Sequence, residues 1–137
     1  MAKNKTNPNR VKEEEKREER TRKLINACQS GVCDSDFNRL NARALQTLID
    51  EELVSGWVMF GDQEADLDDL LRILTESPGT VAEGDYNYDF ENNVGEISIT
   101  LVRLNSADKT SQINFLLNTR SADEVGRYGH GFYDWWD

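Results

Sequence analysis

The chain has 137 residues, of which 37% are hydrophobic and 31% are charged, and its formal net charge is −10. This length allows one domain with a small core. No apolar run approaches the roughly 18 residues of a membrane span, and the polar start of the chain does not have the form of a secretory signal. We therefore expect no membrane location and place the protein in the cytoplasm where it is made, or in a virion.

The charges are divided unevenly along the chain. Residues 1–23 carry nine Lys and Arg against five Glu, a charge of +4, while residues 24–137 carry seven Lys and Arg against twenty-one Asp and Glu, a charge of −14. A single solvated globule needs no such separation. We predict a basic, mixed-charge helical arm over 1–33, an acidic α+β domain over 34–120, and an aromatic and acidic C-terminal tail over 121–137.

The arm is predicted to be helical from Arg10 to about Gln29, because strong helix formers fill this stretch and a glycine follows it. Apolar side chains are almost absent between Val11 and Leu24. The first turns of this helix therefore have no apolar face to bury. Deletion of residues 1–23 is accordingly expected to leave the stability of the domain nearly unchanged.

A core helix is predicted to begin near Asp34 or Ser35, either of which can accept the free amide hydrogens of a first turn. Apolar residues then recur at helical spacing at Phe37, Leu40, Ala44, Leu45, Leu48, Ile49 and Leu53. The short apolar run 57–60 lies between two glycines and suits a buried strand. A further helix is expected over 62–76, where several leucines share one face.

After Gly84 the spacing of apolar residues changes to two, which is typical of strands. The alternating sets are Tyr86, Tyr88 and Phe90, then Ile97, Ile99 and Leu101, then Ile113, Phe115 and Leu117. Three such runs joined by short links predict an antiparallel meander. Helices first and a hairpin sheet after them indicate an α+β fold, in which the N-terminal helices pack on one face of a small antiparallel sheet.

One segment partly matches a calcium-binding loop. Asp85, Asn87 and Asp89, with Glu96 at the twelfth position, stand where such a loop places oxygen ligands. The sixth position needs glycine for a sharp turn, and here it is Phe90. The acids are explained equally well as the exposed face of a strand. We therefore predict no metal ion and no cofactor, and these four residues are the candidate ligands if a metal binds.

No motif in the sequence specifies a reaction. The single histidine, His130, lies between two glycines that do not hold it in place. A P-loop, a nucleophile elbow and a dinucleotide fingerprint are absent from the sequence. The spacing of Cys28 and Cys33 suits neither a redox pair nor half of a zinc site, so both are expected to be reduced structural thiols. We predict that the protein is not an enzyme.

The tail combines aromatic and acidic residues. Its aromatic members are Phe132, Tyr133, Trp135 and Trp136. So many large aromatic side chains are seldom left free in water. Either the tail docks onto its own domain, or it inserts these side chains into a groove of a protein partner. In kind it is similar to the acidic aromatic C-termini of phage and bacterial single-stranded-DNA-binding proteins and clamp-binding factors, which implies a protein partner.

Two charged regions are further candidates for partner contact. In the acidic domain the candidate residues are Asp66, Asp68 and Asp69. Either they face a basic groove of a partner, as in small phage-encoded inhibitors, or they form an ordinary solvated surface. In the arm they are Lys12, Lys16, Arg17 and Arg20. The glutamates interleaved with these cations argue against direct nucleic-acid binding. A mixed-charge helix more often pairs with another protein surface.

Together these features predict a non-enzymatic protein–protein interaction module. It is either a component or adaptor of a larger assembly, for example of a phage, or an acidic inhibitor of a nucleic-acid-binding enzyme. The extended termini favour the assembly component, and the acidity favours the inhibitor. Homo-oligomeric and hetero-oligomeric assemblies both remain open. The alternative is a carboxylate-based metal-binding protein or a small enzyme.

Overall fold

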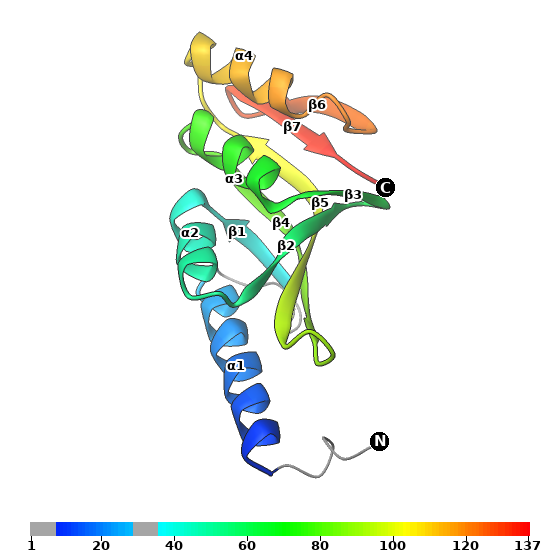
Figure 1. Cartoon of the computed structure of the whole chain (residues 1–137). Helices are drawn as coiled ribbons and strands as arrows, with labels where there is room; N and C mark the ends of the chain where they lie inside the picture. The colour runs from blue at the N-terminus through cyan, green and yellow to red at the C-terminus, as the bar shows by residue number, and fades with distance from the viewer. Residues whose placement is uncertain (1–7, 29–35) are drawn as a thin grey trace.

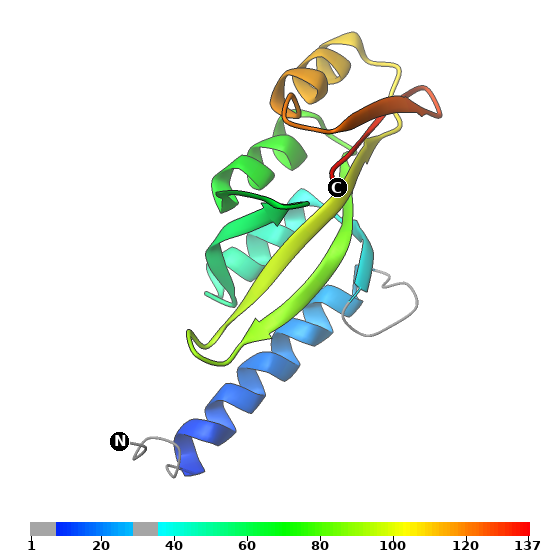
Figure 2. The same cartoon turned by 90° about the vertical axis from the view of Figure 1, so that its right-hand side faces the viewer.

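The computed structural model describes residues 8–28 and 36–137. Within these residues four helices lie on one side of a seven-stranded sheet, which confirms the α+β class (Figure 1, Figure 2). In chain order the elements are α1 (Pro8–Asn26), β1 (Asp36–Leu40), α2 (Ala42–Asp50), β2 (Val54–Phe60), β3 (Gln63–Asp66), α3 (Leu67–Glu76), β4 (Val81–Asp89), β5 (Val94–Leu104), α4 (Lys109–Asn118), β6 (Glu124–Tyr128) and β7 (Gly131–Trp135).

The long strand β5 is the centre of the sheet. Along one edge it pairs with the antiparallel strand β4. Along the other edge its first half runs parallel to β2, and its second half runs antiparallel to β7. The strands β1, β3 and β6 extend the sheet beside β4, β2 and β7 respectively. The predicted tail therefore contains two strands of the sheet, β6 and β7, and its docking onto the chain's own domain is the arrangement that the structure shows.

A bulge in β5 changes which of its residues face the helices. The bulged residue is Thr100, because Ile99 and Leu101 have successive partners in β4. Before the bulge, Ile99 is buried under the helices, and after it Val102 and Leu104 are buried. An extra residue shifts the alternation of a strand by one position. Leu101 consequently lies on the face of the sheet that carries no helix.

The core helix begins later than predicted. Phe37 and Leu40 are buried, but they belong to β1, and α2 begins after Asn41. The Asn41 side chain caps this helix by accepting a 2.8 Å hydrogen bond from an amide of its first turn. The predicted start at Asp34 or Ser35 lies outside the described residues. The next predicted helix is likewise shortened, since β3 precedes it.

The third strand of the predicted meander is a helix, α4. Asp108 caps α4 by accepting a 2.9 Å hydrogen bond from the amide of Ser111. Phe115 is buried, whereas Ile113 and Leu117 are 58% and 54% exposed. The strand prediction was wrong because apolar residues two apart were taken to share one buried face, and two of the three lie in solvent.

The first helix, α1, joins the domain through its C-terminal half. Thr21 and Ile25 are fully buried, and Arg22 stacks over the ring of buried Tyr86. The N-terminal half projects past the β4–β5 hairpin (Figure 1). The expectation that residues 1–23 can be removed without cost does not fit these contacts. None of the described helices combines the length and the apolar character needed to cross a membrane.

Candidate functional site

The face of the sheet turned away from the helices carries several large apolar side chains. In β2, Trp57 and Met59 alternate with buried residues and so point to this face. Trp135 lies opposite Leu101 across the β5–β7 pair. We call this set the apolar face, and it comprises Trp57, Met59, Leu101, Tyr128, Tyr133 and Trp135. Trp135 is 37% exposed and Tyr128 is 40% exposed. Large aromatic side chains are usually more buried, so these two can be contacted by a partner.

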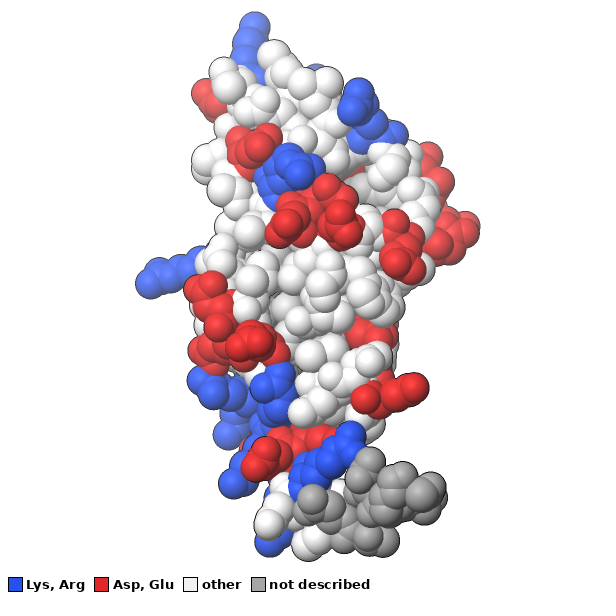
Figure 3. All heavy atoms as spheres, in the orientation of Figure 1, with Lys and Arg blue, Asp and Glu red and all other residues white. Residues whose placement is uncertain are grey.

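Acidic side chains lie beside the apolar face on both of its edges. On β3, Glu64 and Asp66 lie opposite Met59 and Trp57. On β6, Glu124 lies opposite Trp135 and accepts a hydrogen bond from the Tyr133 hydroxyl. On the other side of β5, Glu83 and Asp85 stand on β4, and Glu96 stands on β5 itself. We call this set the acidic border, and it comprises Glu64, Asp66, Glu83, Asp85, Glu96 and Glu124. Figure 3, in the orientation of Figure 1, shows Asp and Glu side chains in several separate groups over the folded domain.

A cation of this face, Arg103, is already engaged. It pairs with Glu83, donates a 2.8 Å hydrogen bond to the carbonyl of Asn38, and lies 5.7 Å from the centre of the Tyr128 ring. Arg39 lines the same small cavity as Arg103 and Tyr128. The arginines are therefore gathered at the Tyr128 end, and the rest of the face is dominated by carboxylates.

The four candidate calcium ligands lie on the same side of the β4–β5 hairpin. Asp85, Asn87 and Asp89 alternate along β4, and Asn87 lies opposite Glu96. Asp89 is occupied by the turn that follows it, because it accepts hydrogen bonds from two backbone amides of that turn. Among the residues that the structure describes, no group of three or more His, Cys, Asp or Glu side chains is close enough to hold a metal ion.

Two of these carboxyl groups sit in unfavourable electrostatic surroundings. Partial burial raises the pKa of Asp85, and the neighbouring charge of Asp36 raises it further. Burial also raises the pKa of Glu96, with a contribution from its hydrogen bond to Asp89. Both carboxylates would gain from a nearby cation.

The structure separates the four aromatic residues of the tail. Tyr133 and Trp135 belong to the apolar face. Phe132 points to the helix side, where the guanidinium of Arg127 lies 5.4 Å from the centre of its ring. Trp136 is 1% exposed and belongs to the core. Two of the four predicted anchors are thus positioned to meet a partner.

The charged candidates do not form one surface. Asp66 borders Trp57 on the open face, whereas Asp68 and Asp69 lie in the first turn of α3, and Asp69 pairs with Arg72 at 2.9 Å. In α1, Lys12 and Lys16 are exposed on the projecting half. Arg20 forms an ion pair with Glu51 at the end of α2. Asp66 therefore borders the apolar face, whereas the other charged candidates lie on helices away from it.

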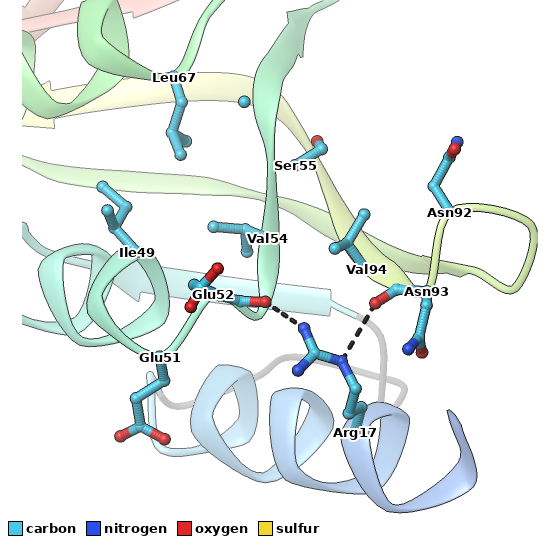
Figure 4. A pocket seen from close by; sticks show the side chains of 11 residues that line it. Arg17, Ile49, Glu51, Glu52, Val54, Ser55, Leu67, Asn92, Asn93 and Val94 are labelled. Atoms are coloured by element: carbon cyan, nitrogen blue, oxygen red, sulfur yellow. Dashed lines mark hydrogen bonds between the residues drawn. The ribbon is translucent and has the colours of Figure 1, made fainter. Parts of the chain in front are cut away.

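The Arg17 side chain lines a cavity of about 590 Å³ between α1, the end of α2 and the β4–β5 turn (Figure 4). Its guanidinium donates hydrogen bonds to the carbonyl oxygens of Glu52 and Asn93, the latter at 3.1 Å. These two acceptor residues have φ values of 54° and 59°, the left-handed conformation that non-glycine residues seldom adopt. One side chain thus links α1 to two strained turns.

Arg17→Ala is expected to lower the free energy of unfolding by about 1–3 kcal/mol, because two partly enclosed carbonyl groups lose a charged donor. Lys16→Ala, at an exposed position on the same helix, should change it by less than about 0.5 kcal/mol. Urea unfolding of both variants measures the difference. Equal effects would show that Arg17 does not fasten the helix.

The other side chains considered for chemistry do not converge. Cys28 is free and buried at the end of α1, and burial raises the pKa of its thiol to about 11. Cys33 lies outside the described residues. His130 is exposed in the β6–β7 turn, where its backbone amide donates a 2.9 Å hydrogen bond to Asn105. These groups come from separate parts of the fold.

Sequence reasoning identified Tyr133 and Trp135 but missed Trp57, Met59 and Leu101. The run 57–60 suits a buried strand, but only its alternate residues Val58 and Phe60 are buried, and Trp57 and Met59 face the other side. Leu101 belongs to the apolar face because of the bulge in β5 and the pairing of β5 with β7. Neither feature can be recognised from a local sequence pattern.

No known protein family, curated protein or solved structure matches this chain. The open sheet face is the feature of this fold from which its function can be inferred.

Proposed function

We propose that this protein is a non-enzymatic interaction module that binds another protein through the apolar face of its sheet, as a component or adaptor of a larger assembly. The observation that carries the proposal is the exposure of Trp135 beside Leu101, on a sheet face that no described helix covers.

The composition of the apolar face supports this proposal. Antiparallel sheets with one solvated face usually present polar residues there. Here Trp57, Met59 and Leu101 stand at those positions on two neighbouring strands. Aromatic residues and methionine are enriched at the centres of protein interfaces, and tryptophan and tyrosine often contribute the largest share of binding free energy.

The acidic border favours a second candidate within the same class, an inhibitor of a nucleic-acid-binding enzyme. Such an enzyme presents a basic groove, and a surface with Glu64, Asp66 and Glu124 around an apolar centre is complementary to one. Both candidates use the same surface, and they differ in the identity of the partner.

The proposal is tested by replacing anchors on the open face and comparing them with exposed apolar residues elsewhere. Trp135→Ser and Trp57→Ser should each reduce the amount of partner that co-purifies with the protein from its source, with an affinity loss of about 30-fold or more, as for a buried aromatic anchor. Ile113→Ser on α4 is the matched control, since Ile113 is 58% exposed on the helix layer.

Thermal unfolding of all three variants checks that the fold is retained. Partner that is lost with the open-face variants and kept with the control supports the proposal. Partner that is retained by Trp135→Ser and Trp57→Ser, or lost equally with Ile113→Ser, contradicts it.

A further inference from the structure

The arrangement of charge across the open face narrows the kind of partner. From β4 to β3 the sheet presents acids, then apolar residues, then acids again. Glu83 and Asp85 stand on β4, and Glu64 and Asp66 stand on β3. Met59 on β2 has Glu64 of β3 on one side, and Ser98 of β5 and then Asp85 of β4 on the other. Further along β5, Leu101 lies between Glu83 of β4 and Trp135 of β7, and Glu124 of β6 follows Trp135. The apolar strip therefore runs along β2 and β7, with Leu101 beside it. A partner that matches this order has an apolar stripe with cations on both sides.

The width of the strip fits a helix. The four strands β4, β5, β2 and β3 are consecutive neighbours in the sheet. At about 4.8 Å between strands, the acids on the outer two are separated by about 14 Å. An α-helix with its side chains is about 10–12 Å across. A helix lying along β2 and β7, between β4 on one side and β3 and β6 on the other, can therefore place basic side chains over both acidic edges while its apolar stripe covers the strip.

The electrostatics of the edge point in the same direction. Asp36 lies opposite Asp85 in the β1–β4 pair. Burial raises the pKa of Asp85, and repulsion from Asp36 raises it further. An arriving Lys or Arg would relieve the repulsion, whereas a carboxylate or a phosphate would add to it. Acidic proteins and nucleic acids are thus poor occupants of this face.

We infer that the apolar face receives a basic amphipathic helix of a partner protein, with Lys or Arg on both sides of its apolar stripe facing the acidic border. This inference rests on the proposed function and adds the chemical class of the partner. Apolar contact with Trp57, Leu101 and Trp135 supplies affinity, and the acidic border sets which helices are accepted.

The test uses two synthetic amphipathic peptides of about 18 residues, enough for roughly 27 Å of helix. One is built from Leu and Lys, and the other has Glu in place of every Lys. Titration calorimetry with the full chain should show saturable binding of the Leu–Lys peptide, weakening as salt is raised, and no binding of the Leu–Glu peptide.

Two double variants with the same change in net charge separate local from general electrostatics. The double variant Glu64→Gln, Asp66→Asn removes two exposed carboxylates of the acidic border. It should lower the affinity for the Leu–Lys peptide at least 10-fold. Asp68→Asn with Asp69→Asn, in the first turn of α3, should change the affinity by less than twofold. Trp135→Ser should weaken it at least 10-fold as well.

The remaining outcomes distinguish the inference from the proposed function. Binding of the Leu–Glu peptide that depends on Trp135 overturns the partner class and leaves the docking surface intact. Leu–Lys binding that is insensitive to Trp135→Ser and to both double variants is nonspecific, and it contradicts both proposals. If neither peptide binds, the inference of a basic helical partner is overturned. The docking surface itself is then tested by the co-purification experiment. Self-association of the free protein, lost in Trp135→Ser, would make a second copy the occupant.

Discussion

Trp136→Ala is expected to lower the free energy of unfolding by about 3–5 kcal/mol, the range for emptying a large aromatic site in a core. Trp136 is 1% exposed, and its ring lies 4.8 Å from that of Phe60 at an angle of 49°. Its indole Nε1 donates a 3.1 Å hydrogen bond to the hydroxyl of Ser121. Alanine would leave a cavity beside Phe60 and remove the hydrogen bond to Ser121, so both packing and an intramolecular hydrogen bond are lost.

The adjacent tryptophan provides the control. Trp135→Ala removes the same side chain from the open face, where its main neighbour is the cross-strand residue Leu101, and should cost about 1 kcal/mol or less. Urea unfolding of the two variants compares them directly. If Trp135→Ala were as damaging as Trp136→Ala, the sides assigned to the end of β7 would be reversed.

Asp134→Asn is expected to stabilise the protein at neutral pH and to remove part of its pH dependence. Asp134 is fully buried between β7 and α4, and burial raises the pKa of its carboxyl to about 6. The Thr119 hydroxyl is in hydrogen-bond contact with both the Phe115 carbonyl and Asp134. Its single hydrogen serves only one of them. A protonated Asp134 that donates from Oδ2 to Thr119 lets the hydroxyl donate to the Phe115 carbonyl, and Asp134 Oδ1 has no partner in either protonation state.

The direction of the pH effect follows from the two pKa values. In the unfolded chain the carboxyl titrates near about 3.9, so the folded state holds the proton more tightly. The stability from this group is present below about pH 4 and is lost as the pH rises through about 6, a change of about 2–3 kcal/mol. In Asp134→Asn this loss is absent, because the amide stays neutral.

The measurement is the difference in unfolding free energy between the two proteins from pH 4 to pH 7.5. Asp85 and Glu96, whose pKa values are also raised, and Asp89 and Asp108, whose pKa values are lowered, are present in both proteins, so their contributions cancel. A difference that stays constant over this range would show that Asp134 does not titrate there.

The fold class could be predicted because the β4–β5 hairpin has long alternating runs joined by a polar turn. The segment 36–40 could not, because Phe37 and Leu40 are three residues apart, as on a helix. In the structure an irregularity in the pairing of β1 with β4 between these two residues turns both of them inward. Where a strand is irregular, spacing alone does not distinguish it from a helix.

The error at α4 had a local signal that was available in the sequence. Asp108 lies three residues before Ser111, at the spacing of an N-cap and the amide it accepts. The alternation of Ile113 and Leu117 was given more weight, yet both are exposed. The spacing of apolar residues alone therefore does not show that they share a buried face.

The candidate site could be predicted only in its local part. Tyr133 and Trp135 were identified from the aromatic composition of one short segment. Their position beside Leu101 depends on the pairing of β5 with a strand about thirty residues later in the chain, and long-range pairing leaves no periodic trace in the sequence. The apolar face is therefore a product of topology.

The bulge at Thr100 is the one place in β5 where the length of the strand can change by a residue without exchanging its faces. Thr100 is exposed, so many side chains can stand there. Because Ile99 and Leu101 already face successive residues of β4, deleting Thr100 would close the ladder and leave Leu101 outside and Val102 inside. A deletion elsewhere in the strand would exchange interior and surface for the residues beyond it, so related sequences should tolerate a missing residue at Thr100 but keep the spacing on either side of it.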